Sequence, residues 1–290
     1  MARKFGVGVV LGALVALAAA WLAGCTAAGP GTGGPAATPA AQLAPAVRLH
    51  GHNDYLQPRP LQTALELGLG SVEADVFLVD GELRVGHERW QLRPGRTLAA
   101  LYLEPLAAFA RAHGGRVRSD GSPFVLLVDI KADGAAVWPV LHAELARAAA
   151  EPGLLTRYAG DRCEPGAVLV LLSGARPFAE VAAAGERWCA LDGRPADLAR
   201  VPLPPPSLVP WISEAWTRVS TWRGYGELEA DERQRIGELV AAVRAAGREL
   251  RFWGAPDRPE AWALLCELGV DRLGTDRPKA AAAWLAAVAR

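Results

Sequence analysis

The sequence has no excess of charge of either sign, because its 290 residues include 31 Lys and Arg against 31 Asp and Glu. A chain without a basic surplus is not typical of proteins that bind nucleic acid, and no basic cluster is present to attract anionic lipid. Only four cysteines occur, and none has the spacing of a metal site. We therefore expect no nucleic-acid partner and no cysteine-bound metal ion.

The N-terminal segment has the pattern of an export signal. Arg3 and Lys4 precede an uncharged apolar run over 7–21, which is too short to span a bilayer comfortably. The run ends in Leu22-Ala23-Gly24-Cys25, which resembles the lipobox of bacterial lipoproteins, where the cysteine is acylated. We predict a signal peptide over 1–25 and a lipid-anchored protein of the cell envelope that faces the periplasm or the exterior. A cleaved signal peptide with an incidental cysteine is the alternative.

A linker separates this segment from the folded part. Residues 26–45 are almost all Ala, Gly, Thr and Pro, a composition that cannot bury a core. Residues 46–290 suit one large domain. An envelope location permits a disulfide, and Cys163 with Cys189 is a conceivable pair, although Cys266 makes the number odd and we treat all three as structural.

Strand-like and helical patterns alternate along the domain, which indicates βαβ units and a parallel sheet. Eight strands in about 245 residues favour a single-domain (β/α)8 barrel. A doubly wound open sheet is the alternative, although no Gly-rich dinucleotide fingerprint follows the first strand. The expected strands are Val47–His52, Ser71–Phe77, Phe124–Ile130, Ala167–Leu172, Trp188–Leu191, Ser207–Ile212, Glu249–Trp253 and Val270–Gly274. The expected helices are Leu61–Leu67, Thr97–His113, Ala135–Ala150, Ala230–Ala246, Pro259–Leu268 and Lys279–Val288.

Pairs of polar residues stand two apart in the first three strands, where an i, i+2 spacing places side chains on one face. The pairs are His50 with His52, Glu73 with Asp75, and Asp129 with Lys131. Because active sites of such barrels lie at the C-terminal ends of the strands, we expect all six side chains to face one space. The alternative is that these residues only form salt bridges with one another or with nearby arginines, which three aligned pairs make less attractive.

Three carboxylates in one pocket need a counter-charge. Oxygen ligands suit Mg²⁺ or Ca²⁺ better than Zn²⁺, so Glu73, Asp75 and Asp129 are predicted to bind one such cation. The His-x-His pattern of His50 and His52 also suggests a zinc amidohydrolase. That function needs histidines on later strands, and none follows His142.

Several segments, in this order, resemble the phospholipase C-like phosphodiesterases, which include the glycerophosphodiester phosphodiesterases. The closest likeness is to the subgroup related to altered inheritance of mitochondria protein 6. The segments are His50-Gly51-His52-Asn53-Asp54-Tyr55, Ser71-Val72-Glu73-Ala74-Asp75-Val76, Asp80-Gly81-Glu82-Leu83, Val85-Gly86-His87, Val128-Asp129-Ile130-Lys131, Arg251-Phe252-Trp253 and 269–278.

The resemblance implies hydrolysis of a glycerophosphodiester or a phospholipid head group, with two histidines as a base and acid pair. His87 follows a predicted hairpin that turns at Asp80-Gly81, and its partner is either His50 or His52. His52 is favoured because its spacing to Glu73 is closer to the pattern of the spider-venom-type sphingomyelinases D, which the chain also resembles. Lys131 and the cation would bind the phosphate. The chain departs from the glycerophosphodiesterase pattern, since Asn53 follows the histidine where an arginine is usual.

Later strand ends are expected to shape the substrate pocket. Arg194 is predicted to meet a head group, Asn53 to orient the phosphate or the ligands of the cation, and Trp216 and Trp253 to contact substrate, although both tryptophans could equally serve packing. A non-catalytic envelope protein that binds ligands on the same barrel is the competing function.

Overall fold

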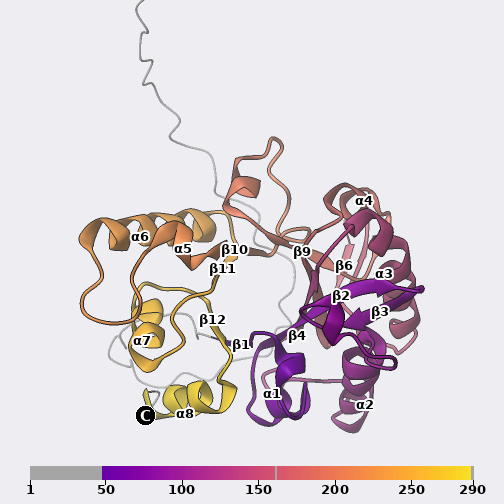
Figure 1. Ribbon diagram of the computed structural model, residues 1–290. Helices are drawn as coiled ribbons and strands as arrows, with labels where there is room; N and C mark the ends of the chain where they lie inside the picture. The colour runs from indigo at the N-terminus through magenta and orange to yellow at the C-terminus, as the bar shows by residue number, and fades with distance from the viewer. Residues whose placement is uncertain (1–47, 161, 289–290) are drawn as a thin grey trace, which may run out of the picture. The chain divides into compact units, whose positions relative to one another are not determined.

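The computed structural model describes residues 48–160 and 162–288, so the predicted signal peptide, Cys25 and the linker lie outside the described part of the chain. Eight parallel strands lie at the centre, and helices surround them (Figure 1). The strands of the barrel are β1 (Arg48–Gly51), β2 (Ser71–Val79), β4 (Phe124–Ile130), β7 (Val168–Gly174), β9 (Ala190–Gly193), β10 (Trp211–Ala215), β11 (Glu249–Trp253) and β12 (Arg272–Thr275).

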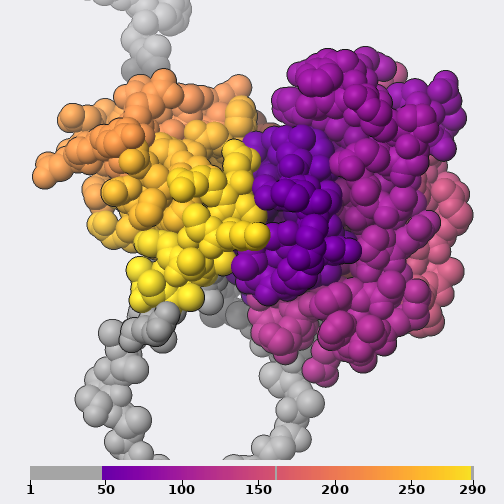
Figure 2. Space-filling view, turned by 60° about the horizontal axis from the view of Figure 1, so that its bottom comes forward, coloured from indigo at the N-terminus to yellow at the C-terminus, as the bar shows by residue number. Residues whose placement is uncertain are grey.

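The sheet closes on itself. β1 pairs in parallel with β12 on one side and with β2 on the other, so that His50 stands opposite both Gly274 and Ser71. In Figure 2 the indigo segment that contains β1 accordingly lies beside the yellow C-terminal segment. The predicted (β/α)8 barrel is therefore confirmed, and the open doubly wound sheet is excluded.

The described helices follow the predicted alternation, with α4 and α5 as additions. They are α1 (Gln62–Glu66), α2 (Glu104–Ala112), α3 (Gly134–Ala148), α4 (Phe178–Ala183), α5 (Trp216–Val219), α6 (Ala230–Ala245), α7 (Pro259–Glu267) and α8 (Pro278–Val288). A π-helix, Ala99–Leu103, leads into α2, and short 3-10 helices occupy Asp54–Leu56, Arg89–Gln91 and Pro195–Ala199. None of the described helices has the length and apolar character that a membrane crossing requires.

β9 and β10 show the largest shifts along the chain from their predicted bounds. β9 begins at Ala190 because the two residues Glu186–Arg187 form β8, which joins β5 (Arg157–Ala159) and β6 (Arg162–Glu164) in a small separate sheet. β10 begins at Trp211 because the chain turns at Pro205, whose carbonyl accepts hydrogen bonds from the amides of Leu208 and Val209.

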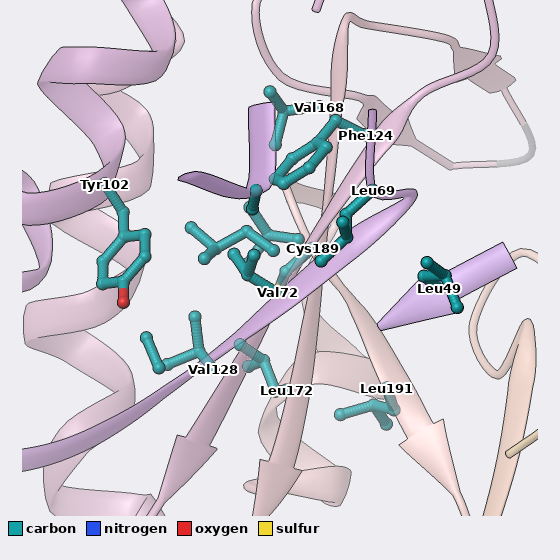
Figure 3. Packing of buried hydrophobic residues seen from close by; sticks show 14 of the residues in the cluster. Leu49, Leu69, Val72, Tyr102, Phe124, Val128, Val168, Leu172, Cys189 and Leu191 are labelled. Carbon is teal, nitrogen blue, oxygen red and sulfur yellow. The ribbon is translucent and has the colours of Figure 1, made fainter. Parts of the chain in front are cut away.

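The cysteines of the described chain are free thiols. Cys163 is exposed and Cys189 is fully buried, so the disulfide that we considered between them is absent. Cys189 instead belongs to the hydrophobic core, in the same cluster as Val72 and Phe124 (Figure 3).

Alternation along the strands builds two apolar layers. Leu126 and Val128 belong to the core between the strands and the helices, which Tyr102 joins from the helical side (Figure 3). Val125 and Leu127 belong to a second cluster inside the barrel, with Leu171, Ala190 and Trp211. The inward-facing rows turn polar toward the C-terminal ends of the strands, since Asp129 is two residues beyond Leu127. Inside the barrel, a charged layer at the C-terminal ends of the strands therefore lies next to the apolar layer.

The predicted hairpin is present. β3 (Glu82–Val85) pairs antiparallel with the end of β2, and both Asp80 and Gly81 have positive φ in the turn. The register brings Val85 opposite Val76, and the amide of Gly86 donates to the carbonyl of Asp75. Strand β3 therefore positions His87 at the mouth of the barrel.

Candidate active site

The three predicted carboxylates lie together. One oxygen each from Glu73, Asp75 and Asp129 fall within 4.8 Å of one another. Asp75 and Asp129 are direct register partners on β2 and β4, and Glu73 lies two residues earlier on the same inward row. The i, i+2 spacing in the sequence therefore correctly predicted that these three side chains face one space.

Asp75 is the centre of a dense network although it is fully buried. Its Oδ2 atom accepts hydrogen bonds from the Tyr55 hydroxyl at 2.8 Å, His87 Nδ1 at 2.8 Å and Lys131 Nζ at 2.8 Å. Lys131 Nζ also donates to Asp129 Oδ2 at 2.7 Å. Burial and the charge of Asp75 raise the pKa of Tyr55 well above its ordinary value, so this hydroxyl remains a donor.

Glu73 is bound from the opposite side of the barrel. Arg251 on β11 donates from Nη2 to Glu73 Oε2 at 2.6 Å, and His50 Nε2 lies 3.2 Å from the same oxygen. Burial opposes ionisation of Glu73, but the charge of Arg251 together with the hydrogen bond from His50 outweighs it and holds the pKa of Glu73 well below its usual range. Glu73 is therefore a buried carboxylate that stays charged.

His50 is enclosed in the barrel, with no exposed surface. Burial, followed by the charge of Arg251, lowers the pKa of His50 to about 3, so the imidazole is neutral. Its Nδ1 pairs with the Ser71 hydroxyl at 2.9 Å, which makes Nε2 the protonated nitrogen that donates to Glu73. Of the two first-strand histidines weighed for catalysis, His50 thus occupies a position that fixes Glu73.

The hydrogen bonds leave oxygens free for a cation. Within the described chain, every hydrogen bond to Asp75 or Asp129 is accepted by Oδ2, and every hydrogen bond to Glu73 is accepted by Oε2. The other oxygen of Asp75, Oδ1, is buried without any partner. A buried carboxylate oxygen without a donor is costly, and a hard cation would satisfy it. The donor set therefore fits a divalent ion that prefers oxygen.

His52 follows β1 at the mouth of the barrel, with about a third of its side chain exposed. Its Nδ1 lies 2.7 Å from Oδ1 of Asp276, the residue that follows β12. Burial alone would lower the pKa of His52, but the hydrogen bond with Asp276 and the charges of Glu73 and Asp276 together raise it above its ordinary value. This pairing leaves Nε2 of His52 as the nitrogen available for proton transfer.

His87 and Asn53 complete the wall around the carboxylates. The imidazole of His87 is half-exposed, and its Nδ1 is held by Asp75, so that Nε2 is again the available nitrogen. Asn53 has a left-handed backbone, φ 47°, and its Oδ1 lies 2.9 Å from the Tyr55 hydroxyl. Asn53 therefore supports the network around Asp75 from the loop after β1.

The predicted substrate contacts separate into two kinds. Trp253 is 48% exposed at the end of β11 and lines a small cavity of about 70 Å³ with His52 and Asp276. Trp216 is only 3% exposed and packs against Phe252 in the core, so the structure shows the packing role that we weighed for it.

Arg194 lies after β9, beyond the carboxylates along the wall of the barrel. Its Nη1 donates to Asp192 Oδ2 at 2.8 Å, and its Nη2 donates to the hydroxyl of Ser173, the register partner of Asp129. About a third of the Arg194 side chain is exposed. The guanidinium is therefore held beside the predicted site with part of its surface available to a ligand.

Sequence reasoning gave no role to Asp276, Arg251 or Tyr55. A signal was available for two of them, because Arg251 is a charged residue within a predicted strand and Asp276 directly follows another. Their contacts cross 224 residues between His52 and Asp276 and 178 residues between Glu73 and Arg251. Only closure of the barrel brings such distant segments together.

Gly174 leaves room for Asp129, and we expect Gly174→Ala to destabilise the protein. A Cβ atom there would lie 2.0 Å from Asp129 Oδ1 and 2.4 Å from the carbonyl of Ile130, at a φ of +66°. Overpacking and backbone strain predict a loss of about 1–3 kcal/mol in the free energy of unfolding. Urea denaturation measures this loss. Gly185→Ala is the control, since nothing lies within 4 Å of a Cβ there, and equal losses in both variants would contradict the prediction.

Comparison with known proteins gives concordant matches. Residues 40–189 match the AIM6-like phosphodiesterase domain. A protein of Arthroderma benhamiae called altered inheritance of mitochondria protein 6 homolog is 30% identical over 265 residues, 81% of this chain and 82% of that protein. Altered inheritance of mitochondria protein 6 of Eremothecium gossypii is 29% identical over 260 residues, 79% of this chain and 67% of that protein.

Among solved structures, a calcium-dependent phosphoinositol-specific phospholipase C from a Pseudomonas species superposes with a TM-score of 0.53 at 13% identity. The superposition covers 80% of this chain and 88% of that chain. It supports the barrel fold.

Proposed function

Because the chain belongs to the AIM6-like phosphodiesterase family, we propose that it hydrolyses phosphoric diesters with the help of one divalent cation, Mg²⁺ or Ca²⁺. The observation that carries the proposal is the convergence of three carboxylates, each with one oxygen outside the hydrogen-bond network. Glu73, Asp75 and Asp129 would hold the cation, which supplies charge neutralisation for the nonbridging phosphate oxygens.

The charges of the site support a diester substrate. Three carboxylates and the two cations Lys131 and Arg251 leave one negative charge, apart from the histidines. A divalent cation changes this sum to one positive charge, which complements the single negative charge of a phosphodiester. Lys131, which directly follows β4, would bind a nonbridging oxygen.

The two histidines are suited to proton transfer. Each has its Nδ1 fixed by a carboxylate, Asp276 for His52 and Asp75 for His87, and presents Nε2. We assign them as the base and acid pair: one Nε2 accepts the proton of the attacking hydroxyl or water, and the other donates a proton to the leaving oxygen. Arg194 and Trp253 would contact the head group or glycerol of the substrate.

A substrate panel tests the reaction class. The purified protein is incubated with a glycerophosphodiester, a phosphomonoester and a simple amide, each with Mg²⁺, Ca²⁺ or Zn²⁺. Cleavage of the diester alone, with Mg²⁺ or Ca²⁺, is the expected result. Amide cleavage with Zn²⁺ alone would favour an amidohydrolase, and binding of a diester without any cleavage would favour a non-catalytic binding protein.

Replacement of Asp276 by asparagine is expected to lower the pKa of His52. The carboxylate favours the charged imidazole, so the pKa lies above its ordinary value while Asp276 is present and falls toward that value without it. NMR titration of His52 measures the shift, and kcat should fall by about one order of magnitude or more. Asp257→Asn is the neighbouring control, and an unchanged His52 titration in Asp276→Asn would contradict the assignment.

The lipid anchor at Cys25 remains a proposal, since it lies outside the described residues and the relatives reported above come from fungi. We expect Cys25→Ser to release the protein from the membrane fraction while activity on soluble diesters is unchanged. Fractionation followed by immunoblotting measures the release. Equal amounts of both variants in the membrane fraction would contradict the anchor.

A further inference from the structure

Arg251 stands out because its charge is buried deep in the barrel. The side chain extends from β11, three strands from β2 around the closed sheet, and is 3% exposed. Its Nη2 atom contacts Glu73 Oε2 at 2.6 Å, and its Nε has no hydrogen-bond partner among the described residues. Burial of a guanidinium with an unsatisfied nitrogen is costly, so stability alone is a poor explanation for the contact with Glu73.

The contact determines how Glu73 can act. Oε2 of Glu73 accepts from both Arg251 and His50, and these two donors fix the orientation of a side chain that otherwise has three rotatable bonds. Only Oε1 then remains for a cation, which limits Glu73 to binding through one oxygen. Asp75 and Asp129 are restricted in the same manner by Lys131.

We propose that Arg251 is a positioning residue that, with His50, locks Glu73 as a one-oxygen ligand of the divalent cation. The inference rests on the proposed function, because it takes the three carboxylates as the cation site. In this role Arg251 acts through Glu73, its hydrogen-bond partner. Loss of such a partner behind a metal ligand typically weakens metal binding by about 10- to 100-fold.

The neighbouring strand offers a matched control. Arg272 on β12 is the register partner of Arg251, is 2% exposed, and pairs with Glu249 at 2.6 Å. It is therefore an equally buried arginine with its own carboxylate, at the same level of the adjacent strand, yet it does not touch Glu73, Asp75 or Asp129. Arg272→Met should affect stability without affecting the cation site.

Isothermal titration with Mn²⁺ tests the proposal on folded full-length protein. Arg251→Met is expected to bind Mn²⁺ about 10- to 100-fold more weakly than the unmodified protein, while Arg251→Lys keeps part of the affinity and Arg272→Met stays within about threefold. Circular dichroism verifies folding. If Arg251→Met is unfolded, Arg251→Lys and Arg251→Gln still decide the matter, since Lys should bind more tightly than Gln.

A double-mutant cycle with Glu73→Gln separates the mechanism from a general effect. If Arg251 acts through Glu73, adding Arg251→Met to Glu73→Gln causes no further loss of Mn²⁺ affinity. Additive losses, or full affinity in Arg251→Met, would overturn the inference while leaving the proposed function intact. Absence of Mn²⁺ binding to the unmodified protein would instead overturn the proposed cation site and this inference with it.

Discussion

Replacement of His52 by alanine is expected to lower kcat/KM for a glycerophosphodiester by about 10²- to 10⁴-fold, the range that a positioned acid or base contributes. The side chain is half-buried at the mouth of the barrel, and Asp276 fixes its tautomer, so no neighbouring group can take over the same proton. Steady-state kinetics measures the loss. The affinity of this variant for Mn²⁺ should stay within about threefold of that of the unmodified protein, because His52 is not a predicted ligand of the cation.

His113→Ala is the control for this variant. His113 directly follows α2, is exposed, and pairs with the carbonyl of Phe109 in that helix. It should keep full activity. If His52→Ala were as active as His113→Ala while His50→Ala was inactive, the assignment of the first-strand histidine would be reversed.

The second large effect concerns Asp75. Asp75→Asn removes a charge that three donors and a predicted cation share, so Mn²⁺ affinity is expected to fall by more than the roughly 100-fold that loss of an outer partner costs. Hydrolysis should fall with it, because His87 and Lys131 lose the group that orients them. Isothermal titration and steady-state kinetics measure the two losses separately.

Asp192→Asn provides the matched control. Asp192 is as deeply buried as Asp75, and its carboxylate accepts from the hydroxyls of Ser173 and Ser213 and from Arg194. The same chemical change there should lower the stability of the protein and raise KM for the diester. The affinity for Mn²⁺ should be unchanged. Equal Mn²⁺ affinities of Asp75→Asn and the unmodified protein would contradict the predicted cation site.

Much of the barrel was predictable because its strands are buried on both sides and read as apolar runs. The segment Phe124–Ile130 was predicted with the bounds that β4 has in the structure. The i, i+2 spacing of Glu73 and Asp75 was informative for a simple reason: strand geometry fixes the face of a side chain without any knowledge of the fold.

Other features depend on contacts that a local pattern cannot contain. The strand pair β5–β8 was missed because each member has only two or three residues. The different surroundings of His50 and His52 were likewise inaccessible, since the sequence predicted both at the end of one strand. Pairing with β2 and β12 encloses His50, whereas His52 lies beyond the pairing and reaches Asp276.

The most direct test of the account is a titration of metal-free protein with Mn²⁺ during hydrolysis of a glycerophosphodiester. The account predicts no hydrolysis in EDTA, a rate that rises in proportion to added Mn²⁺, and saturation at about one equivalent per chain, as expected for a single site formed by Glu73, Asp75 and Asp129. Full activity in EDTA, or no hydrolysis of any diester at saturating Mn²⁺, Mg²⁺ or Ca²⁺, would contradict it.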